Sequence, residues 1–171
     1  EFTNLSVLEN LMMVPGNQSG ENLMNTFLKP SLVAKEEEQI KEKAKEVVEF
    51  LNLKHLSNEL AGNLSGSKKK LLELGRTMMV EAKLVLLDEV GAGVNRTLLK
   101  DLGSAIEKLN KEKGYTFCMI EHDMDFIGRL CDPVIVMAEG SVLFEGSVES
   151  AKKDERVIES YLGSGSKLKG N

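Results

Sequence analysis

Two short apolar runs that end in charged residues restrict the fold of this chain more than any other feature. The first, LVLLDE at 84–89, has four apolar residues in a row, which is typical of a strand buried on both faces. The second occupies 115–120 and is expected to be another buried strand, directly before Glu121 and His122. A helical pattern at 96–113 separates the two runs. Strand, helix and strand in this order predict a parallel sheet with helices packed against it.

The first 80 residues carry helical periodicity, whereas the rest of the chain alternates strand and helix. We expect 1–80 to form an α-helical subdomain, 81–162 a partial α/β core and 163–171 a flexible tail. Glu139 and Gly140 are expected to form the turn of a β-hairpin. The predicted helices lie at 5–12, 33–53, 65–80, 96–113, 123–130 and 148–161, and the predicted hairpin strands lie at 133–138 and 141–145.

Charge, hydropathy and cysteine usage exclude several classes of protein. The net charge of −5 argues against a nucleic-acid binder with a broad basic surface. No apolar run approaches the roughly 20 residues that span a bilayer, and the N-terminus does not resemble a signal peptide. Cys118 and Cys131 lack metal-site spacing and are expected to be reduced thiols. The expected compartment is the cytoplasm.

Three titratable residues follow the two predicted strands. Ligands of parallel sheets bind at the carboxyl ends of the strands, so Asp88 is placed to hold a magnesium ion through water. Glu89 points elsewhere and is placed to polarise a water molecule. If the strands are neighbours, His122 approaches the same crevice. The acidic pair alone is equally well explained as a solvated turn at the end of a strand, and a lone loop histidine is usually uninvolved. The combination of the two motifs favours the functional interpretation.

The stretch LSGSKKKLLELGRTM supplies a possible anion site. Ser65 is expected to cap a helix, and Gly66 allows a ligand to approach the backbone closely. Helix N-terminal amides suit a phosphate, and an anion would relieve the unfavourable position of the lysines at 68–70 in the first helical turn. A solvated basic turn is the simpler alternative.

These motifs resemble those of ABC-transporter ATPases in both order and spacing. LSGSKKKLLELGRTMM resembles the signature motif of that family, and LVLLDEVGAGV resembles its Walker B strand, catalytic glutamate and D-loop. MIEHDMDFI resembles the H-loop, and VIVMAEGSVLFEGSVE the closing hairpin. VLENL, LLELGR and IEHDM are most similar to the ATP-binding subunits of branched-chain amino-acid uptake systems. The resemblance implies an incomplete P-loop NTPase (RecA-like) parallel sheet plus an α-helical signature subdomain.

The resemblance also implies roles for individual residues. Asp88 would serve magnesium through water, Glu89 would be the general base and His122 would contact the γ-phosphate of ATP. The signature residues would contact nucleotide held by a partner subunit, and two further residues would belong to the D-loop. The signature residues are Ser65, Gly66, Ser67 and Lys68, and the D-loop residues are Gly93 and Asn95.

The family's partners follow from the same resemblance. They are membrane permease subunits and a second ATPase subunit, with ATP and magnesium as ligands. The expected location is cytoplasmic and peripheral to the inner membrane.

The phosphate loop of the family, G-x-x-x-x-G-K-[ST], does not occur in these 171 residues. GSGSKLKG near the C-terminus has the wrong spacing. Because that loop cradles the triphosphate, we expect this chain alone neither to bind ATP tightly nor to hydrolyse it. The missing strand would also leave 115–120 with an open edge, which predicts a dimer or a strand-exchanged oligomer. Ser67 and Lys68 replace the usual glycine and glutamine of the signature.

Three functional interpretations remain open. The chain is a piece of an ATPase subunit, as the lack of a methionine before Glu1 suggests, or a non-catalytic module that docks on a permease or a full-length ATPase. A different nucleotide hydrolase is the third. The coding sequence immediately upstream of codon 1 would separate the first two.

Overall fold

The computed structural model describes residues 1–80 and 82–166, with side chains as far as Ser160, and its contacts divide the chain into two compact units. The first unit comprises Glu1–Val85 and Val94–Thr116, and the second comprises Leu86–Gly93 and the chain from Phe117 onward. This division groups 96–113 with the N-terminal helices, whereas the sequence assigned that segment to the α/β part. The functional subdomains expected from the sequence stay a prediction.

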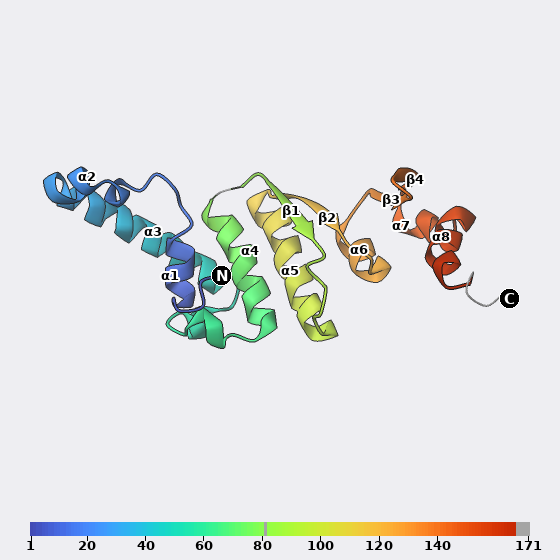
Figure 1. Ribbon diagram of the computed structural model, residues 1–171, viewed down its shortest axis with the longest axis horizontal. Coiled ribbons are helices and arrows are strands. Elements are labelled where there is room, and N and C mark those ends of the chain that lie inside the picture. Colours follow the sequence, from blue (N-terminus) through green and yellow to red (C-terminus); the bar gives the residue numbers. More distant parts are fainter. Residues whose placement is uncertain (81, 167–171) are drawn as a thin grey trace. The chain divides into compact units, whose positions relative to one another are not determined.

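The first unit is built from helices (Figure 1). Its α-helices are α1 (Val7–Met12), α2 (Leu23–Leu28), α3 (Pro30–Phe50), α4 (Gly66–Met79) and α5 (Arg96–Lys113). Three short 3-10 turns join them: η1 (Ser19–Glu21), η2 (Lys54–Leu56) and η3 (Ala61–Asn63). The helix expected at 33–53 therefore begins three residues earlier, because Pro30 is favourable in the first turn of a helix.

The core of the first unit lies where α1, α3 and α4 pack together. Leu11 of α1 and Leu72 of α4 are completely buried there. Gly75 of α4 makes the approach possible, since a Cβ atom at this position would lie 2.8 Å from Cδ1 of Leu51 and 3.1 Å from Cγ1 of Val47. The apolar stripes predicted from helical periodicity thus form one packed interior.

Polar side chains cap three of these helices, and Asn22 caps α2 by accepting the Met24 amide. Ser6 caps α1 through a reciprocal capping box with Glu9, in which each side chain accepts a hydrogen bond from the other residue's backbone amide. Asn95 caps α5, because its Oδ1 accepts the Leu98 amide at 2.9 Å. Helix α5 ends at Gly114, whose φ of 69° is suited to glycine.

Strands β1 (Leu84–Asp88) and β2 (Thr116–Ile120) pair in a two-stranded sheet. The Thr116 amide donates to the Lys83 carbonyl at 2.9 Å, and the Glu89 amide donates to the Ile120 carbonyl at 2.9 Å. The residue numbers of the two strands increase in the same direction between these two hydrogen bonds. The strands are therefore parallel, as predicted from the order strand, helix, strand.

The expectation that both strands are buried on both faces is wrong for the described chain. Successive side chains of a strand point to opposite faces, and only one face is covered here. Val85 is 5% exposed, whereas Leu86 is 73% and Ile120 63% exposed. The apolar run is typical of a strand with side chains packed against both faces. The described residues pack against only one face of this strand.

The second unit contains α6 (Met124–Leu130), β3 (Val134–Ala138), β4 (Ser141–Gly146), α7 (Val148–Ala151) and α8 (Glu155–Ser166). Strands β3 and β4 form the predicted hairpin, with Ala138 opposite Ser141 across the Glu139-Gly140 turn. Both turn residues have positive φ, at 50° and 77°, as a two-residue hairpin turn requires. Its small core joins Val134, Val148 and Ala151.

Two expectations at the C-terminal end need correction. The single helix expected at 148–161 is two helices, because the Asp154 side chain accepts the Arg156 amide and starts a new helix there. The tail expected at 163–171 overlaps the last residues of α8, and 167–171 lie outside the described residues. Among the described helices, none is both long and apolar enough to cross a membrane.

Candidate functional site

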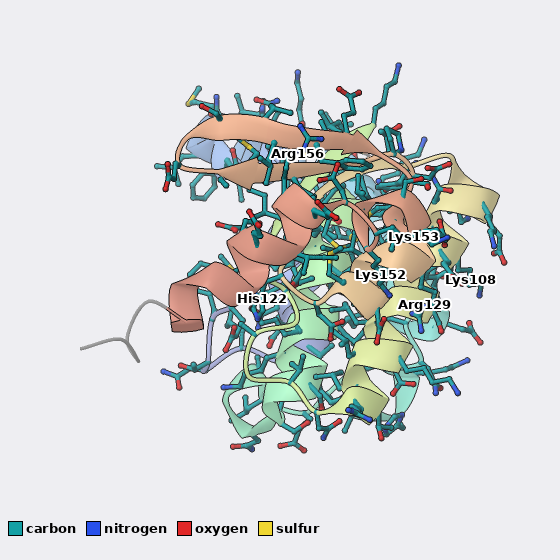
Figure 2. All side chains as sticks on the ribbon, turned by 90° about the vertical axis from the view of Figure 1, so that its right-hand side faces the viewer. Lys108, His122, Arg129, Lys152, Lys153 and Arg156 are labelled. Atoms are coloured by element: carbon teal, nitrogen blue, oxygen red, sulfur yellow. The ribbon has the colours of Figure 1, made fainter. Side chains whose placement is uncertain are left out.

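The loops that follow β1 and β2 bring Glu89 and His122 together. Nδ1 of His122 lies 4.0 Å from Oε1 of Glu89, and both side chains are largely exposed, at 72% and 60%. Figure 2 labels His122. The two residues belong to the same compact unit. The expectation that His122 approaches Glu89 when the two strands are neighbours agrees with this distance, whereas the shared crevice and the catalytic roles stay predictions.

The backbone at Glu89 is strained. Its φ of 44° lies in the left-handed region, which is costly for a residue with a Cβ atom. The Glu89 amide is held by the Ile120 carbonyl, and the Glu89 carbonyl accepts the Ala92 amide at 3.0 Å. The chain thus turns sharply at Glu89, immediately after β1. Backbone strain of this kind is common at functional sites.

Asp88 is the last residue of β1 and is exposed. Among the described residues, no group of three or more His, Cys, Asp or Glu side chains is arranged to hold a metal ion. One exposed carboxylate is nonetheless a suitable donor for magnesium, which keeps several waters and takes further oxygens from a bound phosphate. The role of Asp88 at a magnesium ion stays a prediction.

Glu121 is a site residue that the sequence interpretation did not assign. Its Oε1 accepts the Gly91 amide at 2.7 Å, so a side chain after β2 holds the backbone of the loop after β1. The sequence places Glu121 between strand β2 and His122, but the contact to Gly91 depends on how the two loops meet in the fold.

The signature residues lie in the other compact unit, at the start of α4. Ser65 is the N-cap residue by position, but its side chain makes no capping hydrogen bond, and the expected cap is wrong in that respect. Its Oγ lies instead 2.6 Å from Oγ of Ser67. A Cβ atom at Gly66 would meet nothing within 4 Å, so the backbone of the first turn is open on that side.

The lysines of the first turn of α4 are only partly offset by opposite charge. Nζ of Lys69 lies 3.3 Å from Oε1 of Glu1, and the first turn itself has no acidic residue. Positive charge at a helix N-terminus is unfavourable without an anion. The geometry is compatible with the predicted contact to a phosphate and equally with a solvated basic turn.

The two D-loop residues have distinct local roles. Gly93 has a φ of 72°, a conformation that L side chains rarely adopt. Asn95 is the N-cap of α5. The hydrogen bonds to the loop after β2 thus hold the start of this segment, at Glu89 and Gly91, and Asn95 begins α5.

Basic residues on α6 and in the segment from α7 into α8 are labelled in Figure 2. Lys152 pairs with Asp125 at 2.7 Å, and Arg156 pairs with Asp154 at 2.7 Å. Hydrogen bonding to Asp125 raises the pKa of Lys152 above its usual value. These pairs offset the positive charge locally, so this part of the second unit is a mixed surface.

Comparison with known proteins gives the same assignment as the motifs. Residues 2–92 match the sequence profile of the family described as "ABC transporter". The chain is 42% identical over 159 residues to the probable branched-chain amino acid transport ATP-binding protein LivG of Archaeoglobus fulgidus. It is 38% identical over 163 residues to the protein of the same name in Methanocaldococcus jannaschii. The matches cover 93% of this chain in both cases, and 60% and 62% of those relatives.

The structure is similar to an ATP-binding cassette of an ABC transporter solved in its ADP conformation, with a TM-score of 0.76 and 36% sequence identity. That match covers 95% of this chain and 64% of the solved one. The chain thus spans about three fifths of the length of the relatives it matches. The chain belongs to the ABC transporter family, and its fold is an incomplete form of the α/β fold of the family's ATP-binding cassettes.

Proposed function

We propose that this chain is the signature-bearing and Walker B-bearing part of an ATP-binding subunit that couples ATP hydrolysis to uptake of branched-chain amino acids. The 4.0 Å approach of His122 to Glu89 is the observation that carries this proposal. It joins a carboxylate and an imidazole at the end of a parallel sheet, where nucleotides bind in folds of this class. The names of the LivG relatives support the solute class.

In the proposed reaction, Glu89 accepts a proton from the water that attacks the γ-phosphate. The exposed carboxylate can reach solvent, and the turn at Glu89 fixes its direction. His122 donates a hydrogen bond from its imidazole to an oxygen of the transferred phosphate. Asp88 orients the water shell of a magnesium ion, which when bound neutralises charge on the phosphates.

The signature residues act on a second nucleotide in this proposal. Ser65, Ser67 and the open backbone at Gly66 would face the γ-phosphate of ATP bound by a partner ATPase subunit. Lys68 would add positive charge beside it. The amides of the first turn of α4 supply the dipole that favours such an anion.

ATP binding by the 171 residues alone is expected to be weak. The sequence contains no G-x-x-x-x-G-K-[ST] loop, and neither Asp88 nor Glu89 replaces backbone amides that cradle a triphosphate. Titration of the isolated chain with a fluorescent ATP analogue measures this directly. Micromolar affinity would contradict the expectation.

A chimaera tests the catalytic roles. The part of the Archaeoglobus fulgidus relative that precedes its match to this chain would be joined to residue 1, which supplies a phosphate loop. We expect the chimaera to hydrolyse ATP. Glu89→Gln should lower its turnover roughly 100-fold or more. The exposed control Glu37→Gln should leave turnover unchanged. Unchanged turnover in the Glu89→Gln chimaera would refute the assignment of the base.

A second candidate function is a non-catalytic docking module, and the apolar face of α2 favours it. Leu23, Met24, Phe27 and Leu28 are between 65% and 80% exposed on this short helix. An exposed apolar patch of this kind marks a contact surface. We assign it to a membrane permease subunit, because the relatives are named as parts of transport systems.

The docking alternative has its own test. Phe27→Ser with Leu28→Ser should abolish co-purification with the permease of the same transport system and leave the helical content of the chain unchanged. Retained co-purification would contradict it. A dimer or a strand-exchanged oligomer through the open edge of the strand at 115–120 is the remaining expectation, and a stable monomer in gel filtration would count against it.

A further inference from the structure

We propose that Glu121 is a positioning residue that sets the conformation of the D-loop and of the turn carrying Glu89. The inference rests on the proposed function, because it assigns a role in orienting the base of that reaction. Glu121 itself touches neither a reacting atom nor the Glu89 carboxylate in this assignment. It acts through the backbone of Gly91.

Two hydrogen bonds join the loop after β1 to the loop after β2. The Glu89 amide donates to the Ile120 carbonyl at 2.9 Å, and the Gly91 amide donates to Oε1 of Glu121 at 2.7 Å. The first bond continues the pairing of the parallel sheet. The second is made by a side chain and extends the link two residues beyond Glu89, into the D-loop.

The second bond is the stronger kind. An ionised carboxylate that accepts a backbone amide makes a shorter and stronger hydrogen bond than two neutral groups. Glu121 is half-buried, whereas Glu89 and His122 are exposed, so water competes less well for the Glu121 bond. The loop that carries the exposed Glu89 is thus held by a half-buried hydrogen bond, from the Gly91 amide to Glu121.

The position of Gly91 explains what this bond controls. Gly91 lies between Glu89, whose φ of 44° is strained, and Gly93, whose φ is 72°. The Glu121 carboxylate therefore contacts the backbone between these two residues of positive φ, and its loss would leave the strained turn free to relax.

Amide NMR of the 171-residue chain tests the contact. Hydrogen exchange at the Gly91 amide should be slow in the unsubstituted chain, because this amide donates to Oε1 of Glu121. In Glu121→Gln slow exchange at Gly91 should persist, because the amide oxygen of glutamine can accept the same hydrogen bond. In Glu121→Ala, exchange at Gly91 should become roughly tenfold faster, as expected for a local opening that lost one hydrogen bond.

Glu139→Gln, in the hairpin turn, is the matched control and should leave hydrogen exchange at Gly91 unchanged. Fast exchange at Gly91 in the unsubstituted chain would overturn the inference. So would unchanged exchange in Glu121→Ala with the chain still folded.

Turnover of the chimaera separates this inference from the proposed function. Glu121→Ala should lower kcat roughly tenfold or more and leave KM for ATP unchanged, since small misplacements of a base are costly. Glu121→Gln should restore most of the rate. If Glu89→Gln retains full turnover, the proposed function fails. Hydrogen exchange at Gly91 still tests the contact between Glu121 and Gly91 in that case. If Glu89→Gln is inactive and Glu121→Ala is fully active, the positioning role fails alone.

Discussion

Nδ1 of His122 lies 4.0 Å from Oε1 of Glu89, although a complete helix, α5, separates the two residues in the sequence. The approach follows from parallel pairing. Because β1 and β2 run in the same direction, their carboxyl ends meet at one edge of the sheet. The strained turn at Glu89 and the Glu121 contact to Gly91 then decide how the two loops face each other.

Relief of the strain at Glu89 should stabilise the protein. Asparagine tolerates the left-handed region better than glutamate, so Glu89→Asn should raise the free energy of unfolding by about 1 kcal/mol. Urea denaturation measures it. Glu139→Asn, at a φ of 50° in the hairpin turn, is the matched control and should give a similar gain away from the site. A loss of stability in Glu89→Asn alone would show that the glutamate side chain stabilises the turn.

A methyl group at Gly75 should destabilise the helical unit. Its Cβ would lie 2.8 Å from Cδ1 of Leu51 and 3.2 Å from Cδ2 of Leu11. Overpacking of this kind costs about 1–3 kcal/mol, which exceeds the roughly 1 kcal/mol that alanine gains over glycine in a helix. Thermal unfolding should show a lower Tm for Gly75→Ala.

Gly66→Ala is the control for this substitution, because nothing lies within 4 Å of the added methyl group. The free energy of unfolding of Gly66→Ala should differ from that of the unsubstituted chain by no more than about 0.5 kcal/mol. An equal or higher Tm for Gly75→Ala would mean that the packed helices separate more easily than the contacts imply.

Removal of the cap of α5 should cost stability. Oδ1 of Asn95 accepts the Leu98 amide at 2.9 Å, and replacing an N-cap by alanine costs about 1 kcal/mol. Asn95→Asp should retain nearly all of the stability, because a carboxylate oxygen can accept the same amide. Chemical denaturation of both variants gives the comparison. Equal losses for alanine and aspartate would contradict a capping role.

The capping box of α1 should make stability depend on acid pH. Hydrogen bonds from the Ser6 backbone amide and then its hydroxyl hold the pKa of Glu9 below its ordinary value of 4.5. A lowered pKa in the folded state means that the contribution is present above the unfolded value and is lost as pH falls through the folded one. The stability difference between the unsubstituted chain and Glu9→Gln should therefore shrink from neutral pH to below 4.5. A difference that is constant with pH would contradict it.

The two cysteines should differ in reactivity. Burial, and then the neighbouring Cys118, raises the pKa of the Cys131 thiol, which lowers its thiolate fraction at any given pH. Cys118 is exposed on β2. Iodoacetamide should therefore label Cys118 faster, which mass spectrometry of Cys118→Ser and Cys131→Ser can establish. Faster labelling of Cys131 would indicate that α6 opens readily.

Local sequence patterns predicted most of the helices, strands and turns, because each of these elements depends mainly on residues that are close in the sequence. Helix α5 occupies 96–113 as expected, and the hairpin turn forms at Glu139 and Gly140 as expected. The same reasoning did not anticipate the break between α7 and α8. There a side-chain hydrogen bond at Asp154 outweighs a continuous helical pattern.

The sequence by itself determined the order of the motifs, the parallel pairing that follows from a strand, a helix and a strand, and thereby the meeting of Glu89 with His122. Only the tertiary structure decided which faces are covered and which side chains hold the loops. Burial of Leu86 depends on a second layer that periodicity cannot supply, and the Glu121 contact depends on two loops far apart in the chain. The physical reason is that backbone preference is local, whereas burial and hydrogen-bond partners are properties of the assembled fold.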